Sequence, residues 1–475
     1  MTGVIDYRAY LPAYRLDAQE VAGALGGTAR GSRVVASFDQ DTTTLGVEAA
    51  LPLAPVARAA AASLWFATTA PVYAEKANAP TIHAALDLPP DIPAVDLGAT
   101  PRSGLLALMS AARDGGLAVL ADMRGGAVGG VDERTGGDGS AAVLFGTGDI
   151  VAEVVATGST TAEFLDRWRA PGETTIRSWE ERFGESRYLE LTRRLLEQLE
   201  KQGVNPRGVA RFAVVGGNAR AARSATALLT SLTAASAQEA GMLGQVGDLG
   251  AARAGFALAA LLDAAAPDEL LVLVSLADGA DALVLRTTAA IADHPTRLPV
   301  TAPDERVVVS YPQFLVWRGR VEAETPRRPE PERPSAPYAW RNRQFKHALH
   351  GGRCDHCGAV QLPVPAVCYR CRHSGPFTPV DASGQTARIV TATVDRLAFS
   401  PNPPLMSAVV QFEGGGRIQC ELTDVRKPPA VGDLVRPTFR RGATLNGIHN
   451  YAWKARPVAA PAPGEEASDG PAQPE

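Results

Sequence analysis

The stretch AARAGFALAALLDAAAPDELLVLVSLADGADALVLR, residues 251–286, decides the fold class. Its first part, 251–265, has small apolar residues on nearly every face, as helices buried between two layers do. A turn at 267–268 follows, and apolar strands are predicted at 270–276 and 282–286. A helix that is apolar all round needs a sheet on each side, so this stretch predicts an α/β domain with a central helical layer.

The same order of elements occurs in the first part of the chain. A strand is predicted at 64–67, a helix at 104–113 and two further strands at 117–122 and 141–146. The strand at 212–215 begins the second series, so the two series are offset by roughly 145 residues, far more than the repeat of a solenoid. We therefore expect two copies of one α/β domain.

Cysteine is scarce and unevenly placed. Residues 1–353 contain none, and Cys420 lies alone in a predicted strand, where it reads as a small buried hydrophobe. The other four form two CxxC knuckles separated by ten residues: Cys354, Cys357, Cys368 and Cys371. Two such knuckles close one tetrahedral thiolate site without an open position, so we predict a structural Zn²⁺ in a rubredoxin-like ribbon.

The segments around the knuckles predict a second module. A basic and aromatic stretch at 337–354 reads as a helix leading into the ribbon. After the knuckles, apolar and polar residues alternate in the segments 385–399, 404–422, 432–439 and 449–457, which give about five short strands, the size of an all-β OB-fold barrel.

Proline- and charge-rich segments separate these parts. The predicted limits are 1–160 and 161–322 for the two α/β halves, 323–336 for a linker, 337–378 for the leading helix and ribbon, 379–457 for the OB-fold and 458–475 for a disordered tail.

Composition narrows the classes of function. The chain has 47 Lys+Arg against 51 Asp+Glu and no long basic stripe, which argues against a nucleic acid as the main partner. No apolar run reaches the roughly 18 residues of a membrane span, and the N-terminus lacks a basic segment followed by an apolar one. These features predict a soluble, cytoplasmic protein.

Several stretches resemble one known superfamily. They are GVIDYRAYLPAYRL (3–16), ARGSRVVASFDQDTTTLGVEAA (29–50), TTAPVYAEKANAPTIHAAL (68–86), GDGSAAVLFG (137–146) and VGDLGAARAGFALAALL (246–262). Together they look like hydroxymethylglutaryl-CoA synthases and type III ketoacyl synthases of the thiolase superfamily. The resemblance implies a duplicated thiolase-like layered fold, a homodimer and an acyl-CoA ligand.

The residues that carry the chemistry of this superfamily are replaced here. The position of the nucleophilic Cys falls at Pro101, that of the His at Gly216 and that of the Asn at Asp248, and the carboxylate used as general acid and base falls at or near Ala70. Proline has no nucleophilic atom, and the whole region before residue 354 offers no Cys. Covalent thioester exchange is therefore not expected; Thr100 before Pro101 reads simply as a helix start.

Chemistry without a covalent intermediate remains open. Thiolase-like proteins without the Cys resemble carbon–carbon lyases that use Tyr and Asp for proton transfer, and the candidates here are Asp248 and Tyr311, with Tyr188 and Asp138 as alternatives. An Asp in a Gly-rich turn can also serve only to form the turn.

For the CoA moiety, the resemblance suggests Arg30 and Arg33 on a basic rim, with Arg102 near the mouth of the former active site. The order of helix, ribbon and OB-fold looks like a small acyl-CoA-associated family that accompanies thiolases, in which this module docks and handles CoA.

Three functions compete on this basis. The chain is a non-acylating subunit that partners an active thiolase, or a Cys-independent lyase acting on a β-hydroxyacyl-CoA, or a scaffold without a ligand. Whether it is an enzyme of lipid metabolism, a lyase or an acyltransferase-like protein, stays open at this point.

Overall fold

The described part of the chain forms two compact units. The computed structural model describes residues 2–233, 235–238, 246–298, 306–322, 324, 335–398 and 400–458. The larger unit comprises residues 1–348 and 439–452, and the smaller unit comprises 349–438 and 453–475.

These limits differ from the predicted ones. The leading helix is α12 (Ala336–Arg341) followed by α13 (Arg343–Ala348), and both belong to the larger unit. The helix predicted at 337–354 ends early because Leu349 has a φ of 53° and two glycines follow, so the chain continues as a strand. Most of the predicted linker, and the predicted tail beyond residue 458, lie outside the described residues.

A ten-stranded sheet dominates the larger unit. From edge to edge it contains β12 (Ser236–Ala237), β11 (Val209–Gly216), β13 (Leu270–Leu276), β14 (Gly279–Thr287), β8 (Ala152–Thr161), β1 (Gly3–Tyr10), β7 (Asp138–Gly146), β6 (Leu117–Met123), β4 (Leu64–Thr68) and β5 (Ala94–Gly98). The two halves meet where β8 pairs with β1, and the strands that follow outward on either side occur in corresponding order. This confirms the predicted duplication.

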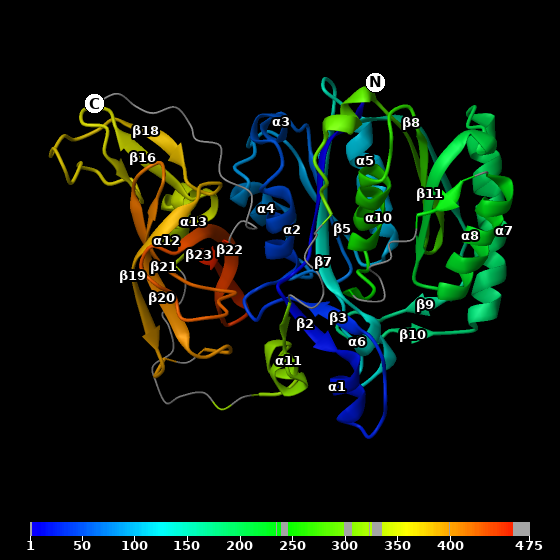
Figure 1. Ribbon diagram of the computed structural model, residues 1–475, viewed down its shortest axis with the longest axis horizontal. Coiled ribbons are helices and arrows are strands. Elements are labelled where there is room, and N and C mark those ends of the chain that lie inside the picture. The colour runs from blue at the N-terminus through cyan, green and yellow to red at the C-terminus, as the bar shows by residue number, and fades with distance from the viewer. Residues whose placement is uncertain are drawn as a thin grey trace. The chain divides into compact units, whose positions relative to one another are not determined.

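Two helices lie between the halves of this sheet: α5 (Arg102–Asp114) and α10 (Ala252–Asp263) (Figure 1). Each contacts the other and strands of both halves. Small residues make this possible, because a Cβ on Gly104 would lie 2.1 Å from the carbonyl oxygen of Ala251, and one on Gly255 would lie 2.5 Å from Cβ of Ala141. The all-round apolar sequence of these helices thus matches the central layer.

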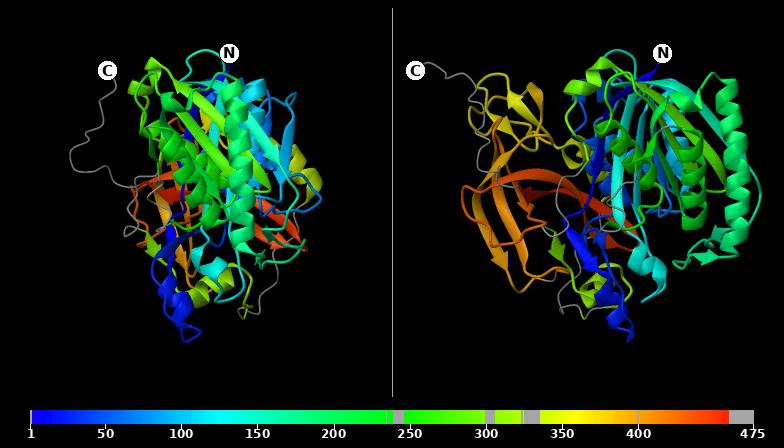
Figure 2. Two further views of the ribbon diagram at one scale, coloured as in Figure 1. Left: turned by 90° about the vertical axis from the view of Figure 1, so that its right-hand side faces the viewer. Right: turned by 45° about the vertical axis from the view of Figure 1, so that its right-hand side comes forward.

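Further helices cover the outer faces. The first half carries α2 (Thr42–Ala50), α3 (Pro55–Ala59) and α4 (Ala79–Ala85), and the second half carries α7 (Glu181–Lys201) and α8 (Ala219–Leu232). Figure 2 shows the long α7 along the outside of the unit. All nine residues of α2 are buried, whereas α7 buries one stripe and leaves its charged side exposed, as an outermost amphipathic helix does.

The remaining elements of the larger unit are short. They are β2 (Tyr14–Asp17), α1 (Ala18–Gly23), β3 (Ser32–Val35), α6 (Val131–Thr135), β9 (Arg167–Trp168), β10 (Arg177–Ser178), β15 (Val307–Val308), α11 (Tyr311–Trp317) and the 3₁₀ turns Pro206–Gly208 and Ala289–Asp293. Strands β9 and β10 form a separate two-stranded hairpin.

The described residues of the smaller unit form β-strands and loops. A three-stranded sheet of β17 (Val360–Gln361), β16 (His350–Cys354) and β18 (Phe377–Asp381) carries the cysteine knuckles. A five-stranded sheet contains β21 (Arg417–Glu421), β20 (Leu405–Phe412), β19 (Ala387–Asp395), β22 (Leu434–Leu445) and β23 (Ile448–Pro457), and residues 439–452 of the last two strands and their turn are counted in the larger unit. Ribbon and barrel strands therefore follow one another as the alternating sequence pattern predicted.

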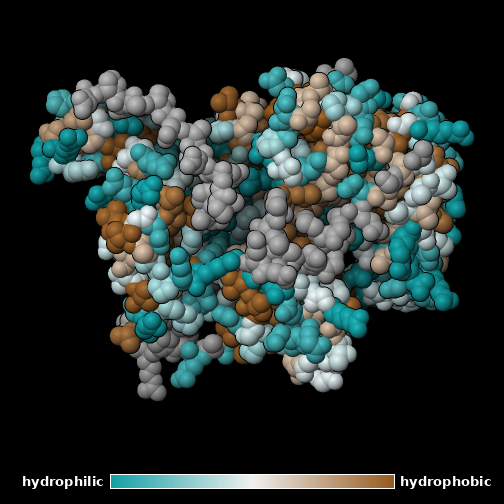
Figure 3. Space-filling model, in the orientation of Figure 1, coloured by the Kyte–Doolittle hydropathy of each residue, from teal (hydrophilic) through white to brown (hydrophobic). Residues whose placement is uncertain are grey.

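No helix in the described ranges is long and apolar enough to cross a bilayer. On the face shown in Figure 3, hydrophilic residues predominate and hydrophobic ones occur in small separate groups.

A buried ion pair ties β3 to β7. Arg33 has no exposed surface, and its guanidinium donates to Asp138 at 3.0 Å and to the carbonyl oxygens of Glu133 and Arg124 at 2.6 and 2.7 Å. The prediction of Arg33 on a phosphate-binding rim is corrected here, because its donors face the interior. Asp138 is equally buried and also pairs with Arg318, so it serves this network rather than catalysis.

Replacing Asp138 should strongly destabilise the larger unit. Asp138→Ala leaves the Arg33 guanidinium buried without its counter-charge, which we expect to lower the free energy of unfolding by about 3–5 kcal/mol in urea denaturation followed by tryptophan fluorescence. The matched control is Asp17→Ala, because Asp17 pairs with Arg15 at 3.3 Å with 38% of its side chain exposed; its effect should stay below about 1 kcal/mol. Equal stabilities of the two variants would contradict this account.

Candidate functional site

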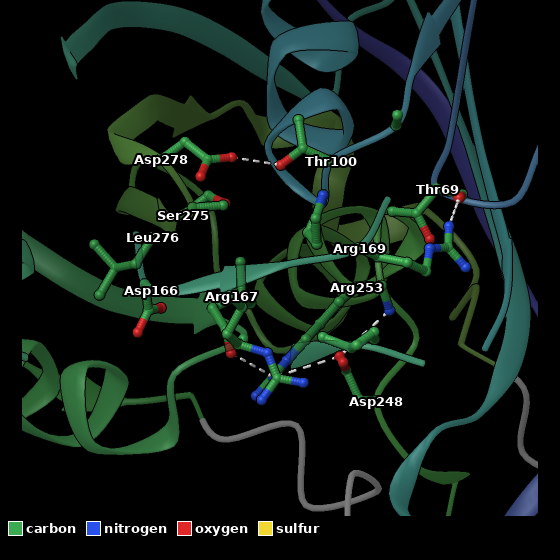
Figure 4. A pocket seen from close by; sticks show the side chains of 18 of the residues that line it. Thr69, Thr100, Asp166, Arg167, Arg169, Asp248, Arg253, Ser275, Leu276 and Asp278 are labelled. Carbon is green, nitrogen blue, oxygen red and sulfur yellow. Dashed lines mark hydrogen bonds and ion pairs between the residues drawn. The ribbon is translucent and has the colours of Figure 1, made fainter. Parts of the chain in front are cut away.

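A pocket of about 330 Å³ lies in the larger unit where several strands end and both central helices begin (Figure 4). Its walls come from residues 98–101 after β5, 215–217 at the end of β11, 275–278 after β13, 250–254 at the start of α10 and 166–169 leading into the β9–β10 hairpin. Strands β11 and β13 run parallel, as do β4 and β5, so their carboxyl ends meet at one edge, the usual place for a ligand in an α/β sheet.

The structure brings together three positions that the sequence singled out as replaced. Pro101, Gly216 and Asp248 all line this pocket. Pro101 stands directly before α5 with a φ of −55°, which suits a helix start, and it brings no reactive atom to the place. The neighbouring Thr100 hydroxyl donates to Asp278 at 2.7 Å. The pocket therefore offers binding and proton transfer but no cysteine nucleophile.

Asp248 lies between two guanidinium groups. Its carboxylate oxygens are 3.8 Å from Arg124 and 3.7 Å from Arg253, longer than hydrogen bonds, and 30% of the side chain is exposed. The backbone around it is fixed, because its N–H donates to Thr135 at 2.7 Å and its carbonyl oxygen accepts from Gly137 at 2.9 Å. Asp248 thus presents a positioned carboxylate to the pocket.

Two arginines, Arg124 and Arg169, contact Thr69. Arg124 donates to the Thr69 hydroxyl at 2.8 Å, and Arg169 donates to the Thr69 carbonyl oxygen. The same hydroxyl donates to Asp122 at 2.8 Å. Burial raises the pKa of Asp122, with the positive charge of Arg124 opposing this, and burial lowers the pKa of Arg169, which the charge of Arg124 lowers further. Thr69, which directly precedes Ala70, therefore joins Arg124 and Arg169.

The opposite wall carries acidic and phenolic groups. Asp166 accepts from the Asn218 amide at 2.9 Å and lies within hydrogen-bonding reach of Tyr188. Tyr188 accepts from the backbone N–H of Asp278 at 3.3 Å. Burial raises the pKa of both Asp166 and Tyr188, which favours the protonated form of each group.

Two pocket residues have backbone conformations that side chains disfavour. Ala99 has a φ of 87° and Asp278 a φ of 50°. Both are non-glycine residues that line the pocket, and such conformations concentrate at functional sites because the surrounding structure must hold them in place.

Other predicted site residues lie elsewhere. Tyr311 does not line the pocket; its hydroxyl donates to Glu133 at 2.6 Å, and burial raises its pKa to about 12. Asp248 and Tyr311 therefore do not line the same pocket, and a catalytic role for Tyr311 stays a prediction. Arg102 follows Pro101, but it pairs with Asp281 at 2.8 Å and donates to the hydroxyl of Thr161, which ties its guanidinium to β8 and β14.

Arg30 lies exposed just before β3, and its contact with a ligand stays a prediction.

Sequence reasoning missed most of the charged residues of the pocket. Arg124 follows β6, Asp166 and Arg169 flank β9, and Arg253 lies on α10 inside the quoted stretch 246–262. The sequence suggested Tyr188 only as an alternative catalytic residue. The signal that could have found Arg253 is its place on α10, where it is the one charged residue near the start of an otherwise apolar helix.

The four cysteines of the smaller unit form a metal-binding cluster. Their Sγ atoms all lie within 4.8 Å of one another, and the pairs Cys354–Cys371 and Cys357–Cys368 are 3.7 Å apart. Four thiolates around a tetrahedral Zn²⁺ at 2.3 Å would be separated by roughly 3.8 Å. The arrangement therefore fits a tetrahedral metal ion, as the CxxC spacing predicted.

Sequence comparison relates the larger unit to enzymes. A hydroxymethylglutaryl-CoA synthase of Methanocaldococcus jannaschii is 31% identical over 225 residues, which cover 43% of this chain and 65% of that enzyme. The corresponding enzyme of Methanopyrus kandleri is 33% identical over 191 residues, 36% of this chain and 54% of the enzyme. The chain thus spans less than two thirds of the length of either relative.

Solved structures show the same fold. A hydroxymethylglutaryl-CoA synthase crystallised with CoA superimposes with a TM-score of 0.57 at 18% identity, covering 66% of this chain and 89% of that one. The synthase of the curacin biosynthetic pathway, in complex with a holo donor-ACP, gives a TM-score of 0.57 at 17% identity, with 66% and 88% covered. The larger unit therefore has the thiolase-like fold.

The smaller unit has relatives of its own. A family model described as the C-terminal OB-fold domain of ChsH2 matches residues 379–440. A DUF35 domain-containing scaffold protein of Methanocaldococcus jannaschii is 29% identical over 126 residues, 25% of this chain and 89% of that protein. The predicted OB-fold is thereby confirmed, and the chain joins a thiolase-like unit to a DUF35-like module.

Metal content tests the cysteine cluster. We expect about one metal ion per purified chain, measured by mass spectrometry of the elements, because the four thiolates form one closed site. Cys368→Ala should lose the ion and lower the melting temperature of the smaller unit. Cys420→Ala is the matched control, since Cys420 is buried on β21 outside the cluster. Equal metal contents in the two variants would contradict the assignment.

Proposed function

We propose that the larger unit binds an acyl-CoA ester without forming an acyl-enzyme, and that the chain is a non-acylating subunit of an active thiolase. The observation that carries this proposal is Pro101 at the start of α5, in the wall of a pocket whose unit contains no cysteine. Acyl transfer through a thioester needs a nucleophilic sulfur, and non-covalent binding does not.

The relatives supply the ligand class. The enzymes that resemble the larger unit are named for a CoA ester, and one solved neighbour was crystallised with CoA. A pocket of about 330 Å³ is at the small end of ligand sites, enough for an acyl group and the adjoining thioester. Arg30 is the remaining candidate for the CoA phosphates.

The relatives of the smaller unit support a docking role. One of them is a DUF35 domain-containing scaffold protein, and scaffolding fits a module whose metal site has no open position. In this proposal the four thiolates hold a structural Zn²⁺, the module docks onto a separate thiolase, and the larger unit forms a homodimer. The protein acts in the cytoplasm, where thiols stay reduced and available to a metal.

A lyase acting on a β-hydroxyacyl-CoA is the second candidate. The observation that favours it is the presence of Tyr188 and Asp166 opposite Arg124 and Arg253 in one pocket. A base on that wall would take the proton of the β-hydroxyl, the Cα–Cβ bond would break to give an aldehyde or ketone, and the arginines would stabilise the thioester enolate until Cα is protonated. Release of a carbonyl product, lost in Tyr188→Phe and in Asp248→Asn, would establish this function.

Binding without acylation is the first expected result. A saturating acyl-CoA should raise the melting temperature of the full chain in a concentration-dependent way, with about 2.7 kcal/mol of stabilisation at 100 times the dissociation constant. Intact-protein mass spectrometry after incubation should show no added acyl group. A stable acyl adduct before residue 354 would overturn the proposal, and a flat melting temperature would remove acyl-CoA as the ligand.

Association with a thiolase is the second expected result. Co-expression with a thiolase encoded beside this chain should give a complex on size-exclusion chromatography, because the match covers 89% of the DUF35 domain-containing scaffold protein. Cys368→Ala should weaken the complex, whereas Cys420→Ala should not. If the wild-type chain elutes separately from the co-expressed thiolase, the subunit assignment is contradicted.

A further inference from the structure

Three guanidinium groups lie along one wall of the pocket, with few of their donors in use. Among the described contacts, Arg253 donates to the carbonyl oxygen of Gly216 at 3.0 Å, and Arg124 and Arg169 each donate once to Thr69. Each guanidinium carries five N–H donors. The Nε of Arg253 is buried without a hydrogen-bond partner in the described structure, so this wall has donors left for a ligand.

The acidic groups on this wall do not balance the positive charge. Asp248 approaches two of the arginines only at 3.7 and 3.8 Å. Asp122 lies 4.0 Å from Arg124, but it already accepts from Thr69 and from the backbone N–H of Ala251 at 2.9 Å, and burial raises its pKa against the opposing charge of Arg124. The fourth arginine of the pocket, Arg167, is paired with Asp132 at 2.8 Å. An excess of positive charge therefore remains where the other three arginines meet.

We infer that the acyl group taken by this pocket ends in a free carboxylate, which Arg169, Arg124 and Arg253 hold. This inference rests on the proposed binding of an acyl-CoA. A planar carboxylate matches the paired N–H groups of a guanidinium, and such charge-assisted hydrogen bonds are about twice as strong as neutral ones.

The opposite wall sets the orientation of the ligand. Asp166 and Asp278 lie there, away from Thr69 and Arg169 (Figure 4). Tyr188 belongs to the same wall, because its hydroxyl accepts from the backbone N–H of Asp278 at 3.3 Å and lies within hydrogen-bonding reach of Asp166. A carboxylate placed against these acidic groups would be repelled, so the free end of the acyl chain points to the arginine wall. The uncharged carbonyl and carbon atoms of the acyl group then face Tyr188.

The hairpin that supplies Arg169 is held in place. Its base is closed by the N–H of Trp179, which donates to the Asp166 carbonyl oxygen at 2.9 Å, and the Asp166 carboxylate accepts from Asn218. Trp168 and Trp179 also pack with ring centroids 6.1 Å apart. Arg169 is therefore presented by an ordered element, which reduces the entropy lost when a ligand binds.

Two CoA esters that differ in a terminal carboxylate test the inference. Isothermal titration calorimetry on the full chain should give glutaryl-CoA a roughly 10- to 100-fold lower dissociation constant than pentanoyl-CoA, the range expected for buried charge-assisted hydrogen bonds. In Arg169→Gln and in Arg253→Gln this ratio should fall towards one, because glutaryl-CoA loses more affinity than pentanoyl-CoA does.

The matched control is Arg177→Gln. Arg177 lies on the same hairpin, pairs with Glu173 on the surface and does not line the pocket, so the ratio should stay at the wild-type value. Far-ultraviolet circular dichroism checks that each variant is folded. Because Arg169 and Arg253 lie on separate elements, the test can still be made with one variant if the other does not fold.

The outcomes separate this inference from the proposed function. Equal affinities for the two esters in the wild type would overturn the carboxylate site and leave acyl-CoA binding intact. An equal loss of affinity for both esters in the arginine variants would also overturn it, because the guanidinium groups would then hold the CoA moiety. Binding of neither ester would overturn the proposed ligand and, with it, this inference.

Discussion

The larger unit depends on burying two helices on all their faces. α5 and α10 can lie between two halves of a sheet only because glycine and alanine replace larger side chains at their contacts; Gly104 and Gly255 are the clearest cases. Close approach fixes the direction of both helices and therefore where both begin. Their N-terminal ends open on the pocket, next to the carboxyl ends of the parallel strands. The site is a consequence of this packing, not an addition to it.

Much of the fold could be predicted from the sequence, and the reasons are local. The strand at Leu270–Leu276 was predicted with its observed limits, because a purely apolar run of that length between turn residues has few other interpretations. The division into units was not predicted. Residues 439–452 join the larger unit through long-range contacts, such as Arg441 donating to the carbonyl oxygen of Phe38 at 2.8 Å, and no local pattern announces such a contact.

The candidate site shows the same limit. The resemblance placed Pro101, Gly216 and Asp248 at positions of one former active site, and the structure places all three on one pocket. It could not reveal Arg169, which reaches the pocket from a hairpin outside the main sheet, or show that Arg33 points inward. A motif predicts the position of a residue only when the backbone around that residue is part of the motif. An arginine on a connecting hairpin lies outside any such motif.

Loss of the sulfur alters the electrostatics of the site as well as its reactivity. The N-terminus of a helix carries a partial positive charge, which in a cysteine enzyme stabilises the thiolate. Pro101 brings no charge to the start of α5, and the Asp278 carboxylate accepts from the hydroxyl of the preceding Thr100 at 2.7 Å. Arg124, Arg169 and Arg253 add positive charge from the neighbouring wall, where Asp248 lies 3.8 Å from Arg124 and 3.7 Å from Arg253. Arg124, Arg169 and Arg253 line a cavity rather than the packed interior, so their remaining donors can be satisfied by a ligand or by solvent.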